Sequence, residues 1–302
     1  MMFGYRDEFE YLECAKCGCL QIKEVPADLS KYYPENYYSY HMNGQSGVED
    51  RTPNFLKRQR LRHYLGRKNA VGALSLKLYK LPKDFFWLRK IGLDLDSEIM
   101  EVGCGSGKLL LQMRAEGFSR LTGVDPFIEK DVSHGSELKI LKKEIAQVTG
   151  QFDFIMLHHS FEHIPEQLIT LKRLYELLKP ERYILLRIPV VAFAWRNYGV
   201  HWVGLDAPRH LYLHTQESMQ ILANQAGFEI KSVKYDSDMF QFLGSEQYLK
   251  DIPLTDERSY FVNPERSIFA PEQIESFKKQ SAALNENNDG HCACFYLYKA
   301  RG

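Results

Sequence analysis

The fold is decided by one glycine-rich stretch, Glu101-Val102-Gly103-Cys104-Gly105-Ser106-Gly107. An apolar pair, Ile99-Met100, precedes it, and an apolar helical pattern runs from Lys108 to about Glu116. This order predicts a strand, a tight turn and a helix. Glycines let a backbone turn with positive φ and let a ligand approach the main chain, and the following helix start offers free N–H groups. We therefore expect a turn that binds a ligand.

The spacing of these glycines helps to separate two classes of ligand. Dinucleotide-binding turns prefer G-x-G-x-x-G, but here Lys108 occupies the position of the last glycine. Glu101 would suit an ammonium group and repel a pyrophosphate. The stretch resembles motif I of the class I S-adenosyl-L-methionine (SAM)-dependent methyltransferases, which implies SAM as the cofactor. A nicotinamide-dependent oxidoreductase and a tight turn without ligand stay open as alternatives.

The composition is that of a globular protein with some appendages. The chain has 302 residues, a formal net charge of zero and six cysteines. Zero net charge gives no general attraction to nucleic acid or membranes, and no apolar run approaches the ~18 residues of a membrane span. The N-terminus has no signal-peptide core, and so few cysteines do not form a disulfide scaffold. We expect a reduced, cytoplasmic protein.

Strand and helix patterns alternate over residues 95–236 and return at 291–299. Such alternation predicts an α/β fold with a parallel sheet covered on both faces. The resemblance implies a Rossmann-like, doubly wound sheet of seven strands, the last antiparallel. The expected strands are 98–102, 120–125, 138–142, 152–158, 181–188, 228–235 and 291–298, and the expected helices are 108–116, 166–179 and 215–226.

We expect three regions along the chain. Residues 1–50 form a cysteine- and aromatic-rich extension, residues 51–94 a basic helical segment, and residues 95–302 the methyltransferase domain with an insertion at 237–290. The basic segment could meet RNA, lipid headgroups or a phosphorylated substrate, or simply be a solvated face, which is what charge runs usually are.

The extension contains half of a zinc-knuckle pattern, Cys14-Ala15-Lys16-Cys17-Gly18. A closed structural zinc site needs four ligands, and the sequence has no second C-x-x-C. The segment resembles the one that leads into many bacterial small-molecule methyltransferases, including zinc-containing sugar C-methyltransferases. Those proteins usually carry an earlier C-x-x-C, so we predict at most weak zinc binding.

Several residues are expected to hold the cofactor. Asp125 ends the second strand about 20 residues after the glycines, where an acid can bind both ribose hydroxyls. Pro126 and Phe127 follow it, placed to cover an adenine. Glu144 stands where methyltransferases often bind the adenine amino group, and a plain surface acid stays open as the alternative. The full cofactor set that the resemblance implies is Glu101, Gly103, Cys104, Gly105, Gly107, Asp125, Pro126, Phe127, Glu144, Ile145 and His158.

A second motif, His158-His159-Ser160-Phe161-Glu162-His163, follows the fourth strand. Ligands in open α/β sheets bind beyond the carboxyl ends of strands, so these side chains should face the crevice. The stretch resembles the post-strand-four motif of ubiquinone-type and natural-product methyltransferases. It also reads as the H-x-x-E-H of a zinc peptidase, but Pro165 disfavours the helix that such a site needs. We predict no metal here.

A third group follows the fifth strand and resembles the D-x-P-x-H substrate loop of the same family. The Trp, Arg and His residues of this loop look exposed, and Trp202, Asp206 and Arg209 are expected to bind the acceptor. Packing stays open as an alternative role for the loop, because aromatic residues also anchor long loops. His159, His163 and His210 are candidate catalytic bases, because imidazole titrates near neutral pH. Arg209 and the basic segment favour an anionic acceptor, such as a sugar nucleotide or a natural-product intermediate.

The sequence thus predicts a SAM-dependent methyltransferase acting on a small polar molecule, with O-methylation favoured over C-methylation. No nucleic-acid partner is expected. A non-catalytic SAM-fold binding protein stays open beside the oxidoreductase, because the glycines would survive the loss of a working acceptor pocket.

Overall fold

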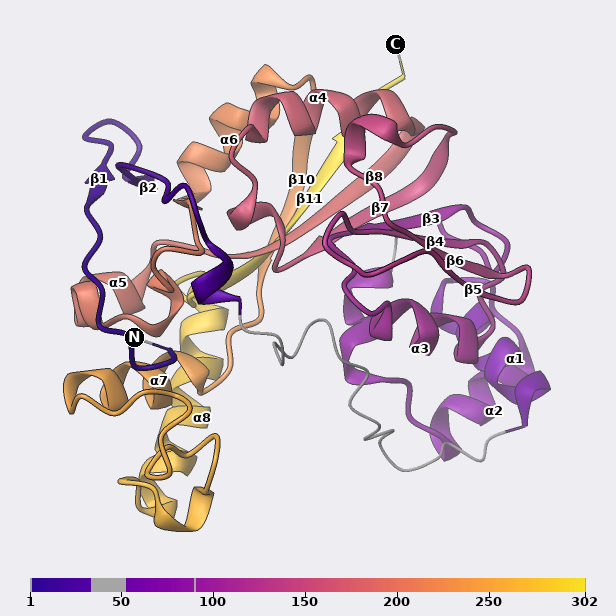
Figure 1. Ribbon diagram of the computed structural model, residues 1–302. Helices are drawn as coiled ribbons and strands as arrows, with labels where there is room; N and C mark the ends of the chain where they lie inside the picture. The colour runs from indigo at the N-terminus through magenta and orange to yellow at the C-terminus, as the bar shows by residue number, and fades with distance from the viewer. Residues whose placement is uncertain (1, 34–52, 90, 302) are drawn as a thin grey trace.

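A computed structural model describes residues 2–33, 53–89 and 91–301, and its centre is one eight-stranded sheet (Figure 1). The spatial order of the strands is β10-β11-β8-β7-β3-β4-β6-β5. Their bounds are β3 Ile99–Val102, β4 Leu121–Val124, β5 Val132–His134, β6 Leu138–Leu141, β7 Phe152–His158, β8 Leu178–Pro189, β10 Glu229–Tyr235 and β11 Cys292–Lys299.

The middle of the sheet is parallel. β6, β4, β3, β7 and β8 pair in parallel, and β11 runs antiparallel between β8 and β10. This confirms the doubly wound α/β fold with an antiparallel last strand. The expected seven strands were one too few, because β5 adds a short antiparallel edge. β5 has only three residues and none of them is buried, so it carries no apolar pattern that the sequence could reveal.

Side chains alternate between the two faces of the sheet, as a pleated strand requires. In β7, Phe154 and Met156 join one core, whereas Ile155 and Leu157 join the other. Helices α4 (Gln167–Leu177) and α6 (Gln216–Gln225) cover the second face, and α3 (Lys108–Glu116) covers the first, with α1 (Asn54–Tyr64) packed against it (Figure 1). α2 (Ala70–Leu78) pairs with α1, and the 3-10 turn η2 (Lys83–Leu88) follows.

The basic segment is anchored by a buried ion pair. Arg60 of α1 is fully buried and places Nη2 2.7 Å from both carboxylate oxygens of Glu116 at the end of α3. Because a buried charge is costly unless it is paired, this bidentate contact fixes α1 on the main domain. Arg51 and Lys90, two of the basic residues of this segment, lie outside the described residues.

The N-terminal extension forms a small second sheet. β1 (Tyr11–Glu13) pairs with β2 (Leu20–Ile22), and β2 pairs with β9 (Tyr212–Leu213) from the loop after β8. The Tyr11 hydroxyl also donates to the carbonyl of His210 at 2.7 Å. The extension therefore supports the loop in which the substrate residues were expected. The tyrosines at positions 37, 38 and 40 lie outside the described residues.

The insertion and the loop after β8 build a third core. Leu20, Trp202, Leu213 and Phe242 are among its buried members. The elements here are α5 (Phe193–Tyr198), the 3-10 turns η5 (Gly199–His201), η6 (Val203–Leu205) and η7 (Pro264–Arg266), and helices α7 (Phe240–Leu249) and α8 (Pro271–Glu286). Among the described residues, no helix has the length and apolar character needed to cross a lipid bilayer.

Candidate functional site

The glycine turn between β3 and α3 needs glycine at each of its three glycine positions. Gly103, Gly105 and Gly107 have φ angles of 71°, 51° and 74°, which side-chain-bearing residues rarely adopt. A Cβ on Gly103 would lie 2.4 Å from Cβ of Ser160, and one on Gly107 would lie 2.2 Å from Cδ1 of Ile140. The turn is therefore closely packed against the loop after β7 and against β6.

Asp125 at the end of β4 holds this turn in place. β4 lies beside β3 in parallel, which brings the Asp125 carboxylate to the turn. Its Oδ2 accepts a hydrogen bond from the backbone N–H of Gly105, and its Oδ1 accepts one from Phe127, both at 2.9 Å. Each carboxylate oxygen has further acceptor capacity, so Asp125 can also meet ligand hydroxyls.

Glu101 is the clearest sign of an expected ligand. Its side chain is 5% exposed, and its Oε2 has no hydrogen-bond partner among the described residues. Burial, with a further contribution from the Asp125 carboxylate, raises the pKa of Glu101 to about 8. A buried carboxyl in this condition is stabilised by an incoming cation. The residues thus fit the ammonium and ribose groups of SAM.

The residues expected to bind adenine are less closely connected to one another than those around the glycine turn. Phe127 is 75% exposed, so its ring is available to cover a flat ligand, while Pro126 beside it is half-buried. Glu144 is exposed and begins the 3-10 turn η3 (Ile145–Gln147), with Ile145 half-buried. Within the described part of the chain, no hydrogen bond joins Glu144 to the glycine turn or to Asp125.

His158 and Cys104 are fixed by packing. The His158 ring lies 4.6 Å, between centroids, from the ring of Trp87 in η2, and burial lowers its pKa well below the usual value. Burial also raises the pKa of the Cys104 thiol. Both groups are therefore neutral at physiological pH. Trp87 was not singled out in the sequence, because it lies in a different region from the motif that it contacts.

A polar cavity of about 240 Å³ gathers the residues expected on the acceptor side. It brings together His159, Glu162, His163, Asp206, Arg209 and His210. The link to the glycine turn is Ser160, whose hydroxyl donates to the carbonyl of Val102 at 2.8 Å. One loop after β7 therefore contacts the expected cofactor turn and also lines the cavity.

Glu162 lies at the centre of this cluster. It is 1% exposed, and neither carboxylate oxygen has a hydrogen-bond partner among the residues that the structure describes. Burial alone would raise its pKa, but His159, His163 and His210 outweigh this and lower it to about 2. Glu162 is therefore ionised. One potential metal-ligating atom from each of Glu162, His163 and His210 lies within 4.8 Å of the other two.

The hydrogen bonds of the histidines assign their tautomers. Nδ1 of His210 lies 2.8 Å from the carbonyl of Gly204, and Nδ1 of His163 lies 2.8 Å from the carbonyl of Arg209. A carbonyl can only accept, so Nδ1 carries a proton in both rings, and Nε2 keeps a lone pair when the ring is neutral. Burial lowers the pKa of His210 to about 4, which keeps its ring neutral near pH 7.

His159 differs from the other two. Its Nε2 lies 2.7 Å from Nη1 of Arg187, and its Nδ1 lies 3.6 Å from Oε1 of Glu162. The guanidinium can only donate, so it occupies the lone pair of Nε2. The remaining N–H faces the carboxylate. This geometry suits His159 to holding Glu162 more than to accepting a proton.

The expected exposure of the substrate loop is wrong for Trp202 and Arg209. Trp202 is fully buried and belongs to the third core, with its ring centroid 6.3 Å from that of His291. Arg209 is 2% exposed and forms an ion pair with Asp206, which is half-buried. The insertion and the N-terminal extension cover this loop, and a local pattern cannot show such long-range covering.

Several cavity residues were missed in the sequence, among them Arg187, Asp236 and His291. Arg187 lies near the end of β8, Asp236 follows β10 and His291 precedes β11, so they meet only because these strands are neighbours. Nε of Arg187 lies 2.6 Å from Oδ2 of Asp236. For Arg187, the available signal was a charged residue within a strand segment whose neighbouring residues are apolar.

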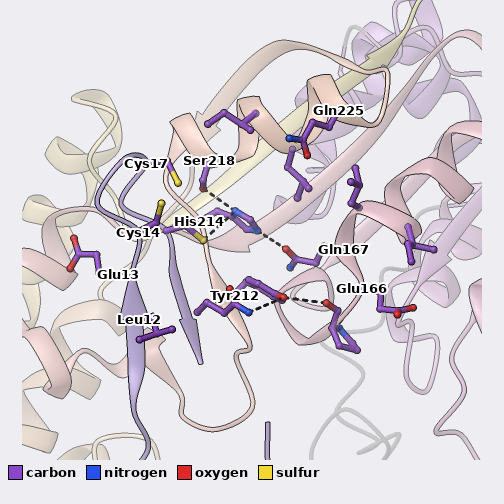
Figure 2. A pocket seen from close by; sticks show the side chains of 17 residues that line it. Leu12, Glu13, Cys14, Cys17, Glu166, Gln167, Tyr212, His214, Ser218 and Gln225 are labelled. Atoms are coloured by element: carbon purple, nitrogen blue, oxygen red, sulfur yellow. Dashed lines mark hydrogen bonds between the residues drawn. The ribbon is translucent and has the colours of Figure 1, made fainter. Parts of the chain in front are cut away.

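A second cavity, of about 540 Å³, lies between the N-terminal hairpin and helices α4 and α6 (Figure 2). Cys14, Cys17 and Cys19 line it from the hairpin, and His214 faces them. Sγ of Cys19 lies 3.8 Å from Nδ1 of His214, but that ring also contacts Ser218 Oγ at 2.9 Å and Gln167 Oε1 at 2.8 Å. Both ring nitrogens are already engaged, so His214 is not an open fourth ligand for zinc.

Comparison with known proteins gives one family match. The family model described as a methyltransferase domain matches residues 58–233, and no curated protein sequence matches the chain. The chain is similar to a solved putative methyltransferase in complex with the Trm112 methyltransferase activator of Haloferax volcanii, with 12% identity, a TM-score of 0.49, and coverage of 70% of this chain and 86% of that one.

Two further solved structures are similar at the same level. The cyclopropane synthase MmaA2 of Mycobacterium tuberculosis shares 16% identity, with a TM-score of 0.45 and coverage of 83% of this chain and 100% of that one. A SAM-dependent methyltransferase of Archaeoglobus fulgidus shares 19% identity, with a TM-score of 0.40 and coverage of 68% and 86%. The match to the methyltransferase-domain model covers more than half of the chain, and the family assignment rests on that match.

Proposed function

The chain belongs to the methyltransferase-domain family, and we propose that it methylates an oxygen of a small polar acceptor bound in the cavity around Glu162. SAM is the cofactor and supplies the methyl group from a sulfonium centre. Because the leaving thioether is neutral, the protein's main tasks are to align the reactants and to exclude water.

The cofactor is proposed to lie along the glycine turn. Glu101 would receive the ammonium group, and Asp125, already fixed by two backbone N–H groups, would receive the ribose hydroxyls. Phe127 would cover the adenine, with Pro126, Glu144 and Ile145 beside it. Gly103, Cys104, Gly105, Gly107 and His158 complete the proposed cofactor set.

The observation that carries the proposal is the shared loop after β7. Ser160 contacts the glycine turn through Val102, while His159 and Glu162 beside it line the polar cavity. A methyl donor on the turn and an acceptor in the cavity would therefore be neighbours. This arrangement supports transfer from one site to the other without a large movement of the chain.

We propose His210 and His163 as the candidate bases. Nδ1 of each ring faces a carbonyl, so the neutral ring offers an Nε2 lone pair, and His210 is neutral near pH 7. When one of these rings takes the hydroxyl proton of the acceptor, the adjacent ionised Glu162 stabilises the imidazolium that forms. His159 is proposed to position Glu162. A hydroxyl acceptor needs such a base, and this favours O-methylation.

The charges of the cavity bear on the acceptor class. Arg187 pairs with Asp236, and Arg209 pairs with Asp206. Both guanidinium groups thus already face carboxylates, and this weakens the argument for an anionic acceptor. A neutral acceptor rich in hydroxyl groups fits the carboxylates and imidazoles better.

Two measurements test this proposal. Titration calorimetry with SAM and with NAD should show binding of SAM only; tight NAD binding would favour the oxidoreductase alternative. Transfer of radiolabel from methyl-labelled SAM across a panel of polyhydroxylated and phenolic acceptors should then identify turnover. SAM binding without transfer to any member of a broad panel, including sugar nucleotides, would favour a non-catalytic SAM-binding protein.

A further inference from the structure

Helix α2 turns an apolar stripe toward solvent. Val71, Leu74 and Leu78 are 44%, 60% and 67% exposed, and their i, i+3, i+7 spacing places them on one side of the helix. The residues that α2 buries are Gly72 and Ser75. This is the reverse of the usual arrangement, in which the apolar stripe of a surface helix faces the core.

Helix α1 packs beside α2. A Cβ on Gly72 would lie 2.2 Å from the carbonyl oxygen of Gln59, and the Ser75 hydroxyl donates to the carbonyl of Leu56 at 3.4 Å. These contacts give an antiparallel register that brings the start of α1 beside the end of α2. We define the α1–α2 patch by its exposed members, which are Phe55, Val71, Leu74, Leu78 and Tyr79.

The patch lies in a strongly cationic part of the chain. Residues 53–83 contain no Asp or Glu. Some of the basic side chains face inward, as Arg60 does. Lys68, Lys77 and Lys80 are exposed, and no described residue forms an ion pair with any of them. Exposed aliphatic side chains and exposed lysines therefore occur together on this helix pair and in the loops that flank α2.

We propose that the α1–α2 patch docks the protein peripherally on an anionic phospholipid surface. Leucine and phenylalanine side chains would enter the boundary of the acyl chains while the lysines contact lipid phosphates, which is the pattern of helices that lie in the membrane interface. RNA offers phosphates but no apolar phase for Leu74 and Leu78. A second copy of this chain would place cation against cation. The combination of charge and apolar surface thus favours lipid.

Vesicle flotation tests the docking without SAM or acceptor, so its outcome is separate from that of the methyl-transfer proposal. The protein should bind vesicles of phosphatidylcholine mixed with phosphatidylglycerol, bind pure phosphatidylcholine weakly, and lose binding as salt is raised. Leu74→Glu with Leu78→Glu should reduce partitioning about tenfold or more, and Lys77→Gln with Lys80→Gln should do the same.

The controls make the test decisive. Val262→Glu changes another exposed aliphatic residue, 55% exposed and outside the patch, and should leave vesicle binding unchanged. SAM binding by each variant checks its fold, and the lysine variants keep the test valid if the leucine variants misfold. Absence of binding to anionic vesicles, equal loss in Val262→Glu, a preference for RNA over vesicles, or a dimer abolished by Leu74→Glu in place of lipid binding would overturn the proposal.

Discussion

Nε2 of His210 lies 3.9 Å from Oε1 of Glu162, although the two residues are 48 positions apart in the chain and come from different loops. Nδ1 of the same ring is held by the Gly204 carbonyl. The ring therefore presents a lone pair to a cavity in which an ionised, buried carboxylate is already in place. This relationship is the basis of the first prediction.

Replacing the base is expected to slow turnover and to leave cofactor binding intact. Removal of a general base typically lowers the rate ~10²–10⁴-fold, so His210→Ala or His163→Ala should do so with SAM affinity near wild type. His159→Ala should have a smaller effect, because its Nε2 lone pair is occupied by Arg187. His201→Ala, which changes an exposed histidine outside the cavity, is the control.

Two outcomes would contradict that assignment. If all three cavity variants keep full kcat on the true acceptor, transfer depends on proximity alone. If they lose SAM affinity, the histidines belong to the cofactor site.

The ribose assignment predicts a loss of SAM affinity in Asp125→Ala. We expect wild-type binding in the micromolar range, about −8 kcal/mol. Removal of charge-assisted hydrogen bonds should weaken it by roughly 1.5–3 kcal/mol, as measured by titration calorimetry. Asp131→Ala is a matched control, because Asp131 also accepts a backbone N–H, from Lys142. Unchanged affinity in Asp125→Ala would refute the assignment.

The pKa of Glu101 predicts a dependence of stability on pH. It is raised from 4.5 to about 8 in the ligand-free fold by burial and by Asp125. The folded state therefore keeps a proton that the unfolded state releases, and the free energy of unfolding should fall as the pH rises between these values. Denaturation of Glu101→Gln should show a flatter pH profile, while Glu129→Gln, which changes an exposed acid, should behave as wild type.

The same carboxyl predicts how SAM affinity depends on pH. An ammonium group favours ionised Glu101, so the affinity for SAM should rise with pH through the same window and should not do so in Glu101→Gln. Calorimetry at the two ends of the window is the measurement. A wild-type affinity that does not change would show that Glu101 does not face the ammonium group.

For the N-terminal cysteines we still predict at most weak, substoichiometric zinc. Cys14, Cys17 and Cys19 supply thiols, but His214 is engaged by Ser218 and Gln167. Elemental analysis of the purified protein is the check. A tight, stoichiometric zinc content that disappears in Cys14→Ser would overturn this expectation.

For the cavity we predict methyl transfer without a metal ion. The proposed bases need a free Nε2, which a bound cation would occupy, so chelation with EDTA should not change kcat. The potential ligand atoms of Glu162, His163 and His210 are close enough together for one cation to contact all three. A stoichiometric divalent cation that is lost together with activity in His210→Ala would contradict the prediction.

The sequence by itself determined the sheet, the glycine turn and the family. A continuous apolar run such as that of β7 encodes a strand buried on both faces, with successive side chains on opposite faces. The glycines of the turn encode a backbone that other residues rarely adopt. These are local properties. They led to the expected strands and helices, to SAM, and to the cavity residues His159, Glu162, His163 and His210.

Only the tertiary structure decided how these parts meet. The burial of Trp202, the convergence of Arg187, Asp236 and His291, and the pairing of β2 with β9 depend on contacts between segments far apart in the chain. The edge strand β5 depends on its pairing with the neighbouring strand β6. A short exposed strand has no periodic pattern, and the burial of a loop depends on what covers it. The free energy of such contacts resides in pairs of distant residues, which a local pattern does not specify.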